Sequence, residues 1–276
     1  MQIAIITSSK DTAGSNIRSN LIELFGFDKT DGKFDGNEVF CCDKIQNKSI
    51  KLYLINEELI FAEDIDKKIS ADVFIFASKH RSKENTPGFT VHPIGNFGEA
   101  DFGGKEKELC FSSAVLLKNL FVELNDVAKE TSFDITMETT HHGPYVEKPA
   151  VFVEIGSTEK EWNNKQNGEI IANTIINALR SENKNYQIAI GIGGPHYCSN
   201  FNKIMLRNNI AISHICPKYR LDKLDEGLMK QSMKKTIEKV DFVLLDWKGL
   251  GKEKQRIVEM LKKLNIETKR TEQVLK

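Results

Sequence analysis

The sequence of 276 residues has no excess of charge, because 39 lysines and arginines balance 39 aspartates and glutamates. This balance excludes a strongly basic protein that coats nucleic acid, although it leaves room for a local basic face. Long hydrophobic runs are also missing, and the stretches at 3–6 and 114–117 fall far short of the ~20 apolar residues that span a membrane. The N-terminal MQIAIITSSK has no basic segment before its apolar run, so it predicts a strand rather than a signal peptide.

Cysteine is scarce, and no C-x-x-C pair occurs among the five cysteines at positions 41, 42, 110, 198 and 216. The scattered, odd set argues against a disulfide framework and favours a reducing cytoplasm. We expect these thiols to be mostly buried and inert. The zinc motif H-E-x-x-H and cysteine-rich zinc spacings are absent too, so any zinc site has to be assembled from dispersed residues.

Phosphate-binding motifs are incomplete. GIGGPH at 191–196 begins like G-x-G-x-x-G but ends in histidine, and Pro195 removes an amide that a phosphate cradle would use. GGKE at 103–106 is not a P-loop. Gly193 and Gly194 could still donate amides to an oxyanion or a substrate carbonyl, and the plainer interpretation is a tight turn after a strand.

Apolar runs of strand length alternate with helix-periodic stretches along nearly the whole chain. Several runs, such as VFIFA at 73–77, are apolar on both faces, which is typical of central strands covered by helices on both sides. The pattern predicts an α/β protein with a mostly parallel sheet, and surface loops at 29–38, 83–88 and 95–104. We expect strands over 2–7, 51–55, 72–77, 89–94, 133–139, 151–155, 187–192, 211–215 and 242–246, and helices over 14–25, 112–129, 168–179, 222–240 and 252–264.

All six histidines lie at or near the end of a predicted strand, and none lies on a predicted helix. Because ligands of open α/β sheets bind outside the carboxyl ends of the strands, several of these side chains can meet in one cleft. Adjacent residues on a strand point to opposite faces, so His141 and His142 can share a site only if the backbone turns, and Gly143–Pro144 supplies a turn. The six are His80, His92, His141, His142, His196 and His214.

Such a cluster serves metal binding, proton transfer or packing. A zinc site would need a carboxylate beside the imidazoles, and Glu138 and Glu154 lie close to predicted strand ends. Glu154 suits a metal ligand or a general base, and a carboxylate paired with lysine or arginine is an equally good interpretation. Two basic clusters stand near the histidines, with aromatic residues able to stack on a base: Lys79, Arg81 and Lys83; Lys218, Arg220 and Lys223; and Tyr145, Tyr197 and Tyr219.

Six segments in chain order resemble the archaeal and plant D-aminoacyl-tRNA deacylases. They are SKHRS (78–82), FTVHPIGN (89–96), TTHHGP (139–144), VFVEIGST (151–158) with Trp162, GIGGPHY (191–197) and SHICPKY (213–219). Each segment alone is modestly specific, whereas six in order are highly specific. The likeness covers essentially the whole chain, so we expect one domain over residues 1–276.

The resemblance implies hydrolysis of the ester that joins a D-amino acid to the terminal adenosine of tRNA, and hence the acceptor end of D-aminoacyl-tRNA as partner. It implies a three-layer α/β/α fold similar to phosphorylase/hydrolase-like proteins, with a mostly parallel or mixed sheet. It also implies zinc dependence, with two ions per subunit. We expect a cytoplasmic, monomeric protein without a membrane segment.

The resemblance and the residue chemistry together give expected roles. Zinc held by imidazoles lowers the pKa of its water to about 7 and polarises a carbonyl. The residues expected to hold zinc are His80, His141, His142 and His196, and those expected to act in catalysis are His142, Glu154 and His196. The residues expected to contact the substrate are Lys79, Arg81, His92, Gly193, Gly194, His214, Lys218 and Arg220.

Two other functions fit the same residues. A zinc peptidase-like or phosphorylase-like enzyme would use the histidines on a small substrate, and its basic loops would be incidental. A non-catalytic tRNA-binding module would use the histidines to contact RNA and would bind no metal. Activity assays and metal analysis separate the three.

Overall fold

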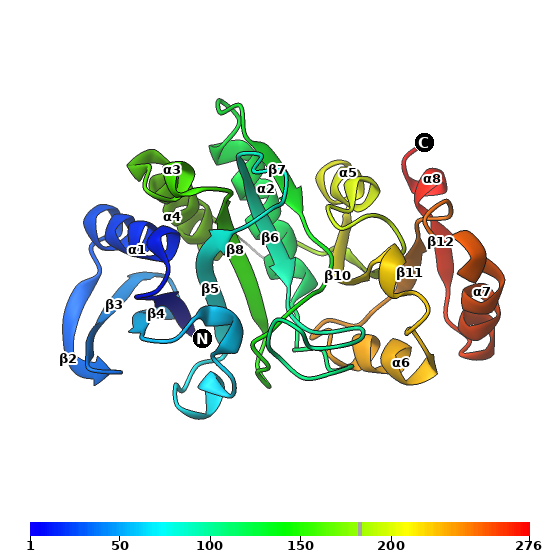
Figure 1. Ribbon diagram of the computed structural model, residues 1–276, viewed down its shortest axis with the longest axis horizontal. Helices are drawn as coiled ribbons and strands as arrows, with labels where there is room; N and C mark the ends of the chain where they lie inside the picture. Colours follow the sequence, from blue (N-terminus) through cyan, green and yellow to red (C-terminus); the bar gives the residue numbers. More distant parts are fainter. Residues whose placement is uncertain (182–183) are drawn as a thin grey trace.

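The computed structural model describes residues 1–181 and 184–276, which form two β-sheets with helices packed around them (Figure 1). The larger sheet has the strand order β2-β3-β4-β1-β5-β8-β6-β7 and the smaller has the order β10-β9-β11-β12. Strands of the larger sheet are β1 (Gln2–Ser8), β2 (Asp28–Phe34), β3 (Asn37–Ile45), β4 (Lys48–Ile55), β5 (Val73–His80), β6 (Gly88–Pro93), β7 (Asp134–Met137) and β8 (Ala150–Gly156). Those of the smaller sheet are β9 (Gln187–Ile192), β10 (Ile210–Cys216), β11 (Phe242–Leu245) and β12 (Thr268–Arg270).

Most neighbouring strands are parallel, and the exceptions matter for the site. The β2–β3 and β3–β4 pairs are antiparallel, as is the β6–β8 pair near the other edge of the larger sheet. The antiparallel register of β6 and β8 places Thr90 directly across from Glu154 and His92 directly across from Phe152.

Alternate residues of the central strands enter two different cores. In β5, Val73, Ile75 and Ala77 pack in one core, beneath helices α1 (Thr12–Phe25), α2 (Ala114–Val127) and α4 (Lys165–Arg180). Phe74 and Phe76 face the other side of the sheet and pack with residues of the 3₁₀ turn η1 (Leu59–Phe61) and of the segment around Tyr145. Glu154 alternates with Val153 and Ile155, which belong to the helix-covered core, so its carboxylate lies on the side of Phe74 and Phe76.

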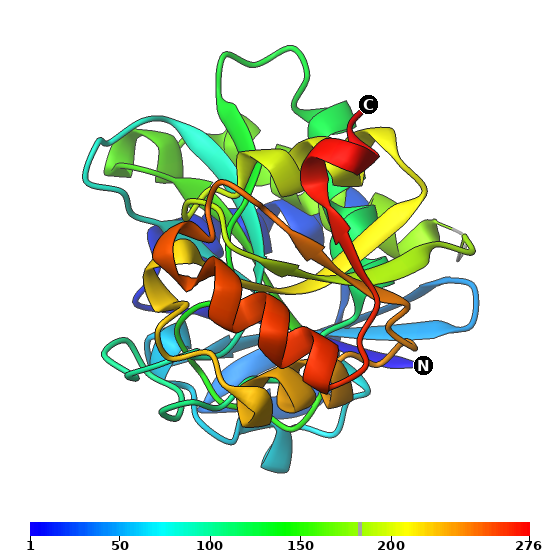
Figure 2. The same ribbon diagram turned by 90° about the vertical axis from the view of Figure 1, so that its right-hand side faces the viewer.

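The helices cover both sheets. α6 and α7 pack against the smaller sheet through a third core, and α7 crosses the face seen in Figure 2. The α-helices are α1 (Thr12–Phe25), α2 (Ala114–Val127), α3 (Glu159–Trp162), α4 (Lys165–Arg180), α5 (Ser199–Arg207), α6 (Glu226–Lys234), α7 (Lys254–Lys263) and α8 (Thr271–Val274), and the 3₁₀ turns are η1 (Leu59–Phe61), η2 (Ile65–Lys67), η3 (Lys218–Arg220) and η4 (Gly251–Glu253).

The predicted α/β class is confirmed, and every strand expected from an apolar run is present. The surface loop expected at 29–38 is wrong, because this segment forms most of β2 and the turn into β3. The expected mostly parallel or mixed arrangement is present as two sheets, of which the larger is mixed and the smaller is parallel. Four of the five cysteines are buried, and all five are free thiols. No helix among residues 1–181 and 184–276 is long and apolar enough to cross a membrane.

Candidate metal and active site

A buried carboxylate, Glu154, stands at the centre of the site. Its neighbours across the sheet are Ser78 on β5 and Thr90 on β6, one on each side. The Ser78 hydroxyl donates to Glu154 Oε1 at 2.6 Å, and the Thr90 hydroxyl donates to Oε2 at 3.0 Å. Both carboxylate oxygens are therefore fixed by the sheet itself, which leaves the charge facing His80, whose Nδ1 lies 3.4 Å from Oε2.

A second carboxylate, Glu138, follows β7 and is completely buried. Its Oε1 lies 3.1 Å from His80 Nδ1, and its Oε2 lies 3.3 Å from His141 Nε2 and 3.0 Å from His196 Nε2. Glu138 thus joins histidines from three separate segments. Since an isolated buried carboxylate is costly, a ring of imidazoles around it indicates a built site rather than incidental packing.

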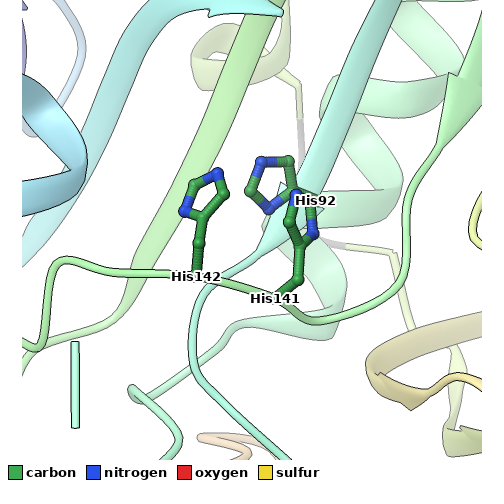
Figure 3. A group of neighbouring side chains, drawn as sticks. All are labelled: His92, His141 and His142. Atoms are coloured by element: carbon green, nitrogen blue, oxygen red, sulfur yellow. The ribbon is translucent and has the colours of Figure 1, made fainter. Parts of the chain in front are cut away.

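Three further ring contacts gather His92, His141 and His142 (Figure 3). The ring centroids of His92 lie 4.1 Å from His141 and 4.8 Å from His142, and those of the adjacent pair lie 4.3 Å apart. His142 has a left-handed backbone, with φ of 47°, so the chain turns between the two adjacent residues and directs both rings to one place. This is the turn that the sequence requires for His141 and His142 to share a site.

The hydrogen bonds of these three rings fix which nitrogen faces the cluster. In each ring Nδ1 lies within hydrogen-bond distance of a backbone carbonyl oxygen, which can only accept. Nδ1 therefore carries the proton, and in the neutral ring Nε2 keeps a free lone pair. The carbonyls belong to Pro93 for His92, Thr139 for His141 and Gly143 for His142, at 3.1, 2.8 and 2.6 Å.

That arrangement is typical of histidines that bind metal through Nε2, because a carbonyl on the other nitrogen orients the ring and sets its tautomer. His92 Nε2 is buried and has no hydrogen-bond partner in the described part of the chain, whereas Glu138 Oε1 has only the ionic contact with His80. The side chains form three overlapping groups whose ligand atoms lie within 4.8 Å of one another: His92, His141 and His142; Glu138, His141 and His196; and His80, Glu138 and Glu154.

The protonation of the rings differs across the cluster. Burial, together with the neighbouring His142, lowers the pKa of His92 to about 3. Burial likewise lowers the pKa of His141 and His142, so these rings are neutral and able to bind a cation. Burial also disfavours the charged form of His80, but Glu154 and Glu138 outweigh it and raise the pKa of His80 to about 9.

A cleft of about 580 Å³ opens onto this cluster. His80, His141, His142, His196 and Glu154 line its floor together with Lys79 and Arg81. A smaller hollow of about 230 Å³ reaches His141, His142 and His196 from the side of Tyr219 and Arg220. The sequence therefore identified most of the residues that meet here, from loops far apart in the chain.

His214 does not join them. It is completely buried in β10, where its Nδ1 lies 3.4 Å from the Thr140 hydroxyl, and burial lowers its pKa to about 4. A fully covered ring offers no atom to a substrate, so the expectation of substrate contact is wrong for His214.

Gly193 and Gly194 do not line the cleft. The Gly193 amide donates to the Cys216 carbonyl at 2.8 Å, and Gly194 is buried close to Gly249. Both glycines have positive φ, which confirms that they form a tight turn after β9. The expectation that an amide serves an oxyanion is therefore wrong for Gly193, and for Gly194 it stays a prediction.

Only some of the basic and aromatic side chains predicted to contact the substrate line the cleft. Lys79 and Arg81 line the cleft, whereas Arg220 and Lys223 pair with Glu99 and Lys218 does not line it. Among the tyrosines expected to stack on a base, Tyr145 is buried, while Tyr219 approaches His196 Nδ1 at 3.0 Å and Tyr197 approaches His80 Nε2 at 3.3 Å.

A sequence model of the D-aminoacyl-tRNA deacylases matches residues 67–269, a segment that contains the whole cluster of histidines and carboxylates. The chain belongs to the D-aminoacyl-tRNA deacylase family. Members named D-aminoacyl-tRNA deacylase from Pyrococcus furiosus and Archaeoglobus fulgidus are 39% and 34% identical to it. The alignment with the first covers 95% of this chain and 97% of the relative, and that with the second covers 92% and 90%.

The family fold is also seen in a crystal structure of a conserved protein of unknown function. It is 33% identical to this chain, covers 100% of this chain and 96% of its own, and superposes with a TM-score of 0.89. The expected resemblance and fold class are thereby confirmed over the whole length.

The sequence does not single out every residue of the site. It indicates Glu138 only as one of two candidate carboxylates, although the position of Glu138 at a strand end, three residues before His141, is a usable signal. Ser78 and Thr90 carry no recognisable motif, and only the strand register reveals that they hold Glu154.

Proposed function

We propose that this chain hydrolyses the ester bond of D-aminoacyl-tRNA, giving the free D-amino acid and tRNA, with zinc as cofactor. Membership of the family supports the reaction. The observation that carries the cofactor is the common orientation of His92, His141 and His142, in which each Nδ1 faces a backbone carbonyl and each Nε2 faces the cluster. Removal of D-amino acids from tRNA makes such an enzyme a chiral proofreading and detoxifying activity.

The donors present fit zinc, which binds imidazole nitrogen and carboxylate oxygen. The first of two ions would be held by His92, His141 and His142, and the second by Glu138 together with His80 once that ring has given up its proton. Glu154 and His196 then remain beside the ions for proton transfer. The buried His92 Nε2, which has no hydrogen-bond partner among the described residues, supports this assignment because a cation would satisfy it.

When bound, zinc supplies a water of lowered pKa and polarises the ester carbonyl. Glu154 is held by two hydroxyls and accepts a proton from the attacking water. His196 is one-third exposed and lies beside the Tyr219 hydroxyl, which suits it to give a proton to the departing ribose oxygen. The water oxygen bonds to the ester carbon, the bond to the ribose oxygen breaks, and that oxygen leaves protonated.

His142 is expected to be indispensable because its Nε2 is available to a metal and its ring touches His92 and His141. Lys79 and Arg81 line the same cleft and would hold phosphates of the acceptor end. The larger sheet contributes residues to the site, and so do the segments that follow β9 and β10 of the smaller sheet, which supports one functional domain over 1–276. Free, mostly buried thiols are consistent with a cytoplasmic protein, and we propose that it acts as a monomer.

The decisive experiment is hydrolysis of D-Tyr-tRNA and L-Tyr-tRNA by the purified protein, with and without a chelator, alongside metal analysis. We expect release of D-tyrosine only, loss of activity on chelation and recovery on addition of zinc. His142→Ala should abolish most of the activity, and Lys165→Ala, on the exposed part of α4, should not.

Hydrolysis of D-amino-acid peptides or of nucleosides, without action on D-Tyr-tRNA, would favour the small-substrate enzyme. Full RNA binding by a protein that contains no zinc and hydrolyses nothing would favour the binding module. A His142→Ala protein that hydrolyses D-Tyr-tRNA at the wild-type rate would refute the assigned centre.

A further inference from the structure

Two large aromatic side chains stand exposed on the lining of the 580 Å³ cleft. Phe102 is 67% exposed and Phe61 is 43% exposed, although phenylalanine is among the residues most often buried. They are the only phenylalanines among the strongly exposed large hydrophobic residues of the described chain. Exposed apolar surface gathered at one cleft marks a place where something binds.

Both rings come from segments that are held against each other. Gly103, with φ of +76°, lies so close to η1 that a Cβ there would meet the Ile60 carbonyl oxygen at 1.9 Å and the Phe61 ring at 3.2 Å. Only glycine allows this approach. The exposure of the two rings is thus a feature of packed backbone rather than of a loose loop.

The loop that carries Phe102 is also hydrogen-bonded to the turn that contains His142 and Gly143. The Gly143 amide, next to His142, donates to the Phe102 carbonyl at 3.0 Å. The Gly104 amide donates to Glu63, which also accepts from the Tyr145 amide. Phe102 is therefore held at a fixed position relative to His142, as a group that positions a substrate must be.

The charges of the cleft identify the ligand class. Lys10, Lys79 and Arg81 line the cleft with the two phenyl rings, and Glu58 is its one exposed carboxylate among the described residues. Flat apolar rings together with cations bind single-stranded nucleic acid, because the bases stack and the phosphates pair with the cations. The volume lies within the roughly 300–1,000 Å³ typical of small-ligand sites.

We propose that Phe102 and Phe61 form the stacking surface for the terminal base of the aminoacylated RNA. This inference rests on the proposed function, in which the scissile ester is carried by the terminal nucleoside. With the base on the phenyl rings, the ester of the same nucleoside lies at the histidine cluster and the preceding phosphates lie at Lys79 and Arg81. The rings are positioning residues, since they touch the substrate away from the bond that breaks.

The test measures binding of uncharged tRNA and of the same tRNA lacking its terminal adenosine, for the full chain and for Phe102→Ala, Phe61→Ala and Phe102→Trp. Loss of stacking on one base should weaken binding of the complete tRNA about 5- to 100-fold. The shortened tRNA should bind equally to all variants, and Phe102→Trp should bind like the wild type. Leu24→Ala, which removes a 47% exposed side chain from α1 outside the cleft, is the control and should change nothing.

Equal weakening for both RNAs, or none for either, would overturn the proposal. A second arm compares hydrolysis of D-Tyr-tRNA and D-Ala-tRNA: stacking on the base predicts the same fold-increase in KM for both. A loss confined to D-Tyr-tRNA would instead place the amino-acid side chain on the rings. Because the binding arm needs no hydrolysis, it stands even if the chain proves inactive on D-aminoacyl-tRNA, so failure of the function and failure of this inference are distinguished.

Discussion

Thr90 lies directly across the sheet from Glu154, on antiparallel strands, and its hydroxyl donates to Glu154 Oε2 at 3.0 Å. Ser78 completes the arrangement from the other neighbouring strand. A carboxylate held in this way cannot rotate away from His80, and its orientation is set by strand register. The larger sheet therefore sets the geometry of the candidate site and does not merely support loops.

Thr90→Val keeps the shape of the side chain and removes the hydroxyl. We expect the affinity for zinc, or the activity, to fall about 10- to 100-fold, as is typical when a group that orients a metal ligand is lost. Thr7→Val is the matched control, because the Thr7 hydroxyl is equally buried but donates to the Tyr53 carbonyl. Zinc titration and hydrolysis assays on both variants check this, and equal behaviour of the two would contradict it.

Glu138→Gln removes a negative charge that contacts three imidazoles without changing volume. Because Glu138 belongs to two of the three candidate metal groups, bound zinc should drop and hydrolysis should fall by at least about 100-fold. Metal analysis by mass spectrometry and a rate measurement check this. Glu99→Gln alters an exposed carboxylate that pairs with Arg220 and Lys223, and it should retain its zinc. Full zinc occupancy in Glu138→Gln would contradict the assignment.

The fold could be predicted where burial shapes the sequence. Strands such as β5 and β9 are apolar on both faces, and that pattern is visible without coordinates. β2 could not be found in this way, because DKTDGKF is polar and largely exposed. It exists through pairing with β3, which is a tertiary interaction that no local pattern reveals.

The residues of the site likewise include some that the sequence predicts and some that only the packing of the chain reveals. Placement of histidines at strand ends predicts that they can meet, and five of the six do. His214 lies near a strand end as well, but it belongs to the buried strand β10 of the smaller sheet, where its ring is completely covered. Phe61 and Phe102 gave no sequence signal, since phenylalanine suggests core until its exposure is known. Whether each of these side chains is covered or exposed depends on which element packs against it, and that is set by the topology of the fold.

Stability should depend on pH through His214. Burial lowers its pKa to about 4, against about 6.5 for an unfolded histidine, so the unfolded chain binds this proton first. The stabilising effect of the neutral ring is present above pH ~6.5 and is lost as the pH falls toward 4. In that window each pH unit should cost about 1.4 kcal/mol per such group. The free energy of unfolding is measured by urea titration between pH 4.5 and 6.5 with chelator present. In His214→Asn its slope against pH should be smaller by about 1.4 kcal/mol per pH unit, and an unchanged slope would exclude this role.

The contact between the His142 turn and the Phe102 loop can be tested with one methyl group. A Cβ on Gly143 would meet the Gly104 nitrogen at 2.2 Å and the Ile60 carbonyl oxygen at 2.5 Å, so Gly143→Ala must push the two segments apart. Overpacking of this kind should lower the free energy of unfolding by about 1–3 kcal/mol. Because His142 is the adjacent residue, a shift near 1 Å should also reduce hydrolysis about 100-fold.

The control for this steric effect is Gly36→Ala, whose φ of +78° is unfavourable for alanine but whose Cβ would have nothing within 4 Å. It should lose about 1–2 kcal/mol of stability through backbone strain alone, with full activity. Thermal unfolding and D-Tyr-tRNA hydrolysis on the two variants separate the effects. If both lose stability alike and both stay active, the Gly143 contact does not position His142, and the cluster is held by the sheet and the carbonyl hydrogen bonds alone.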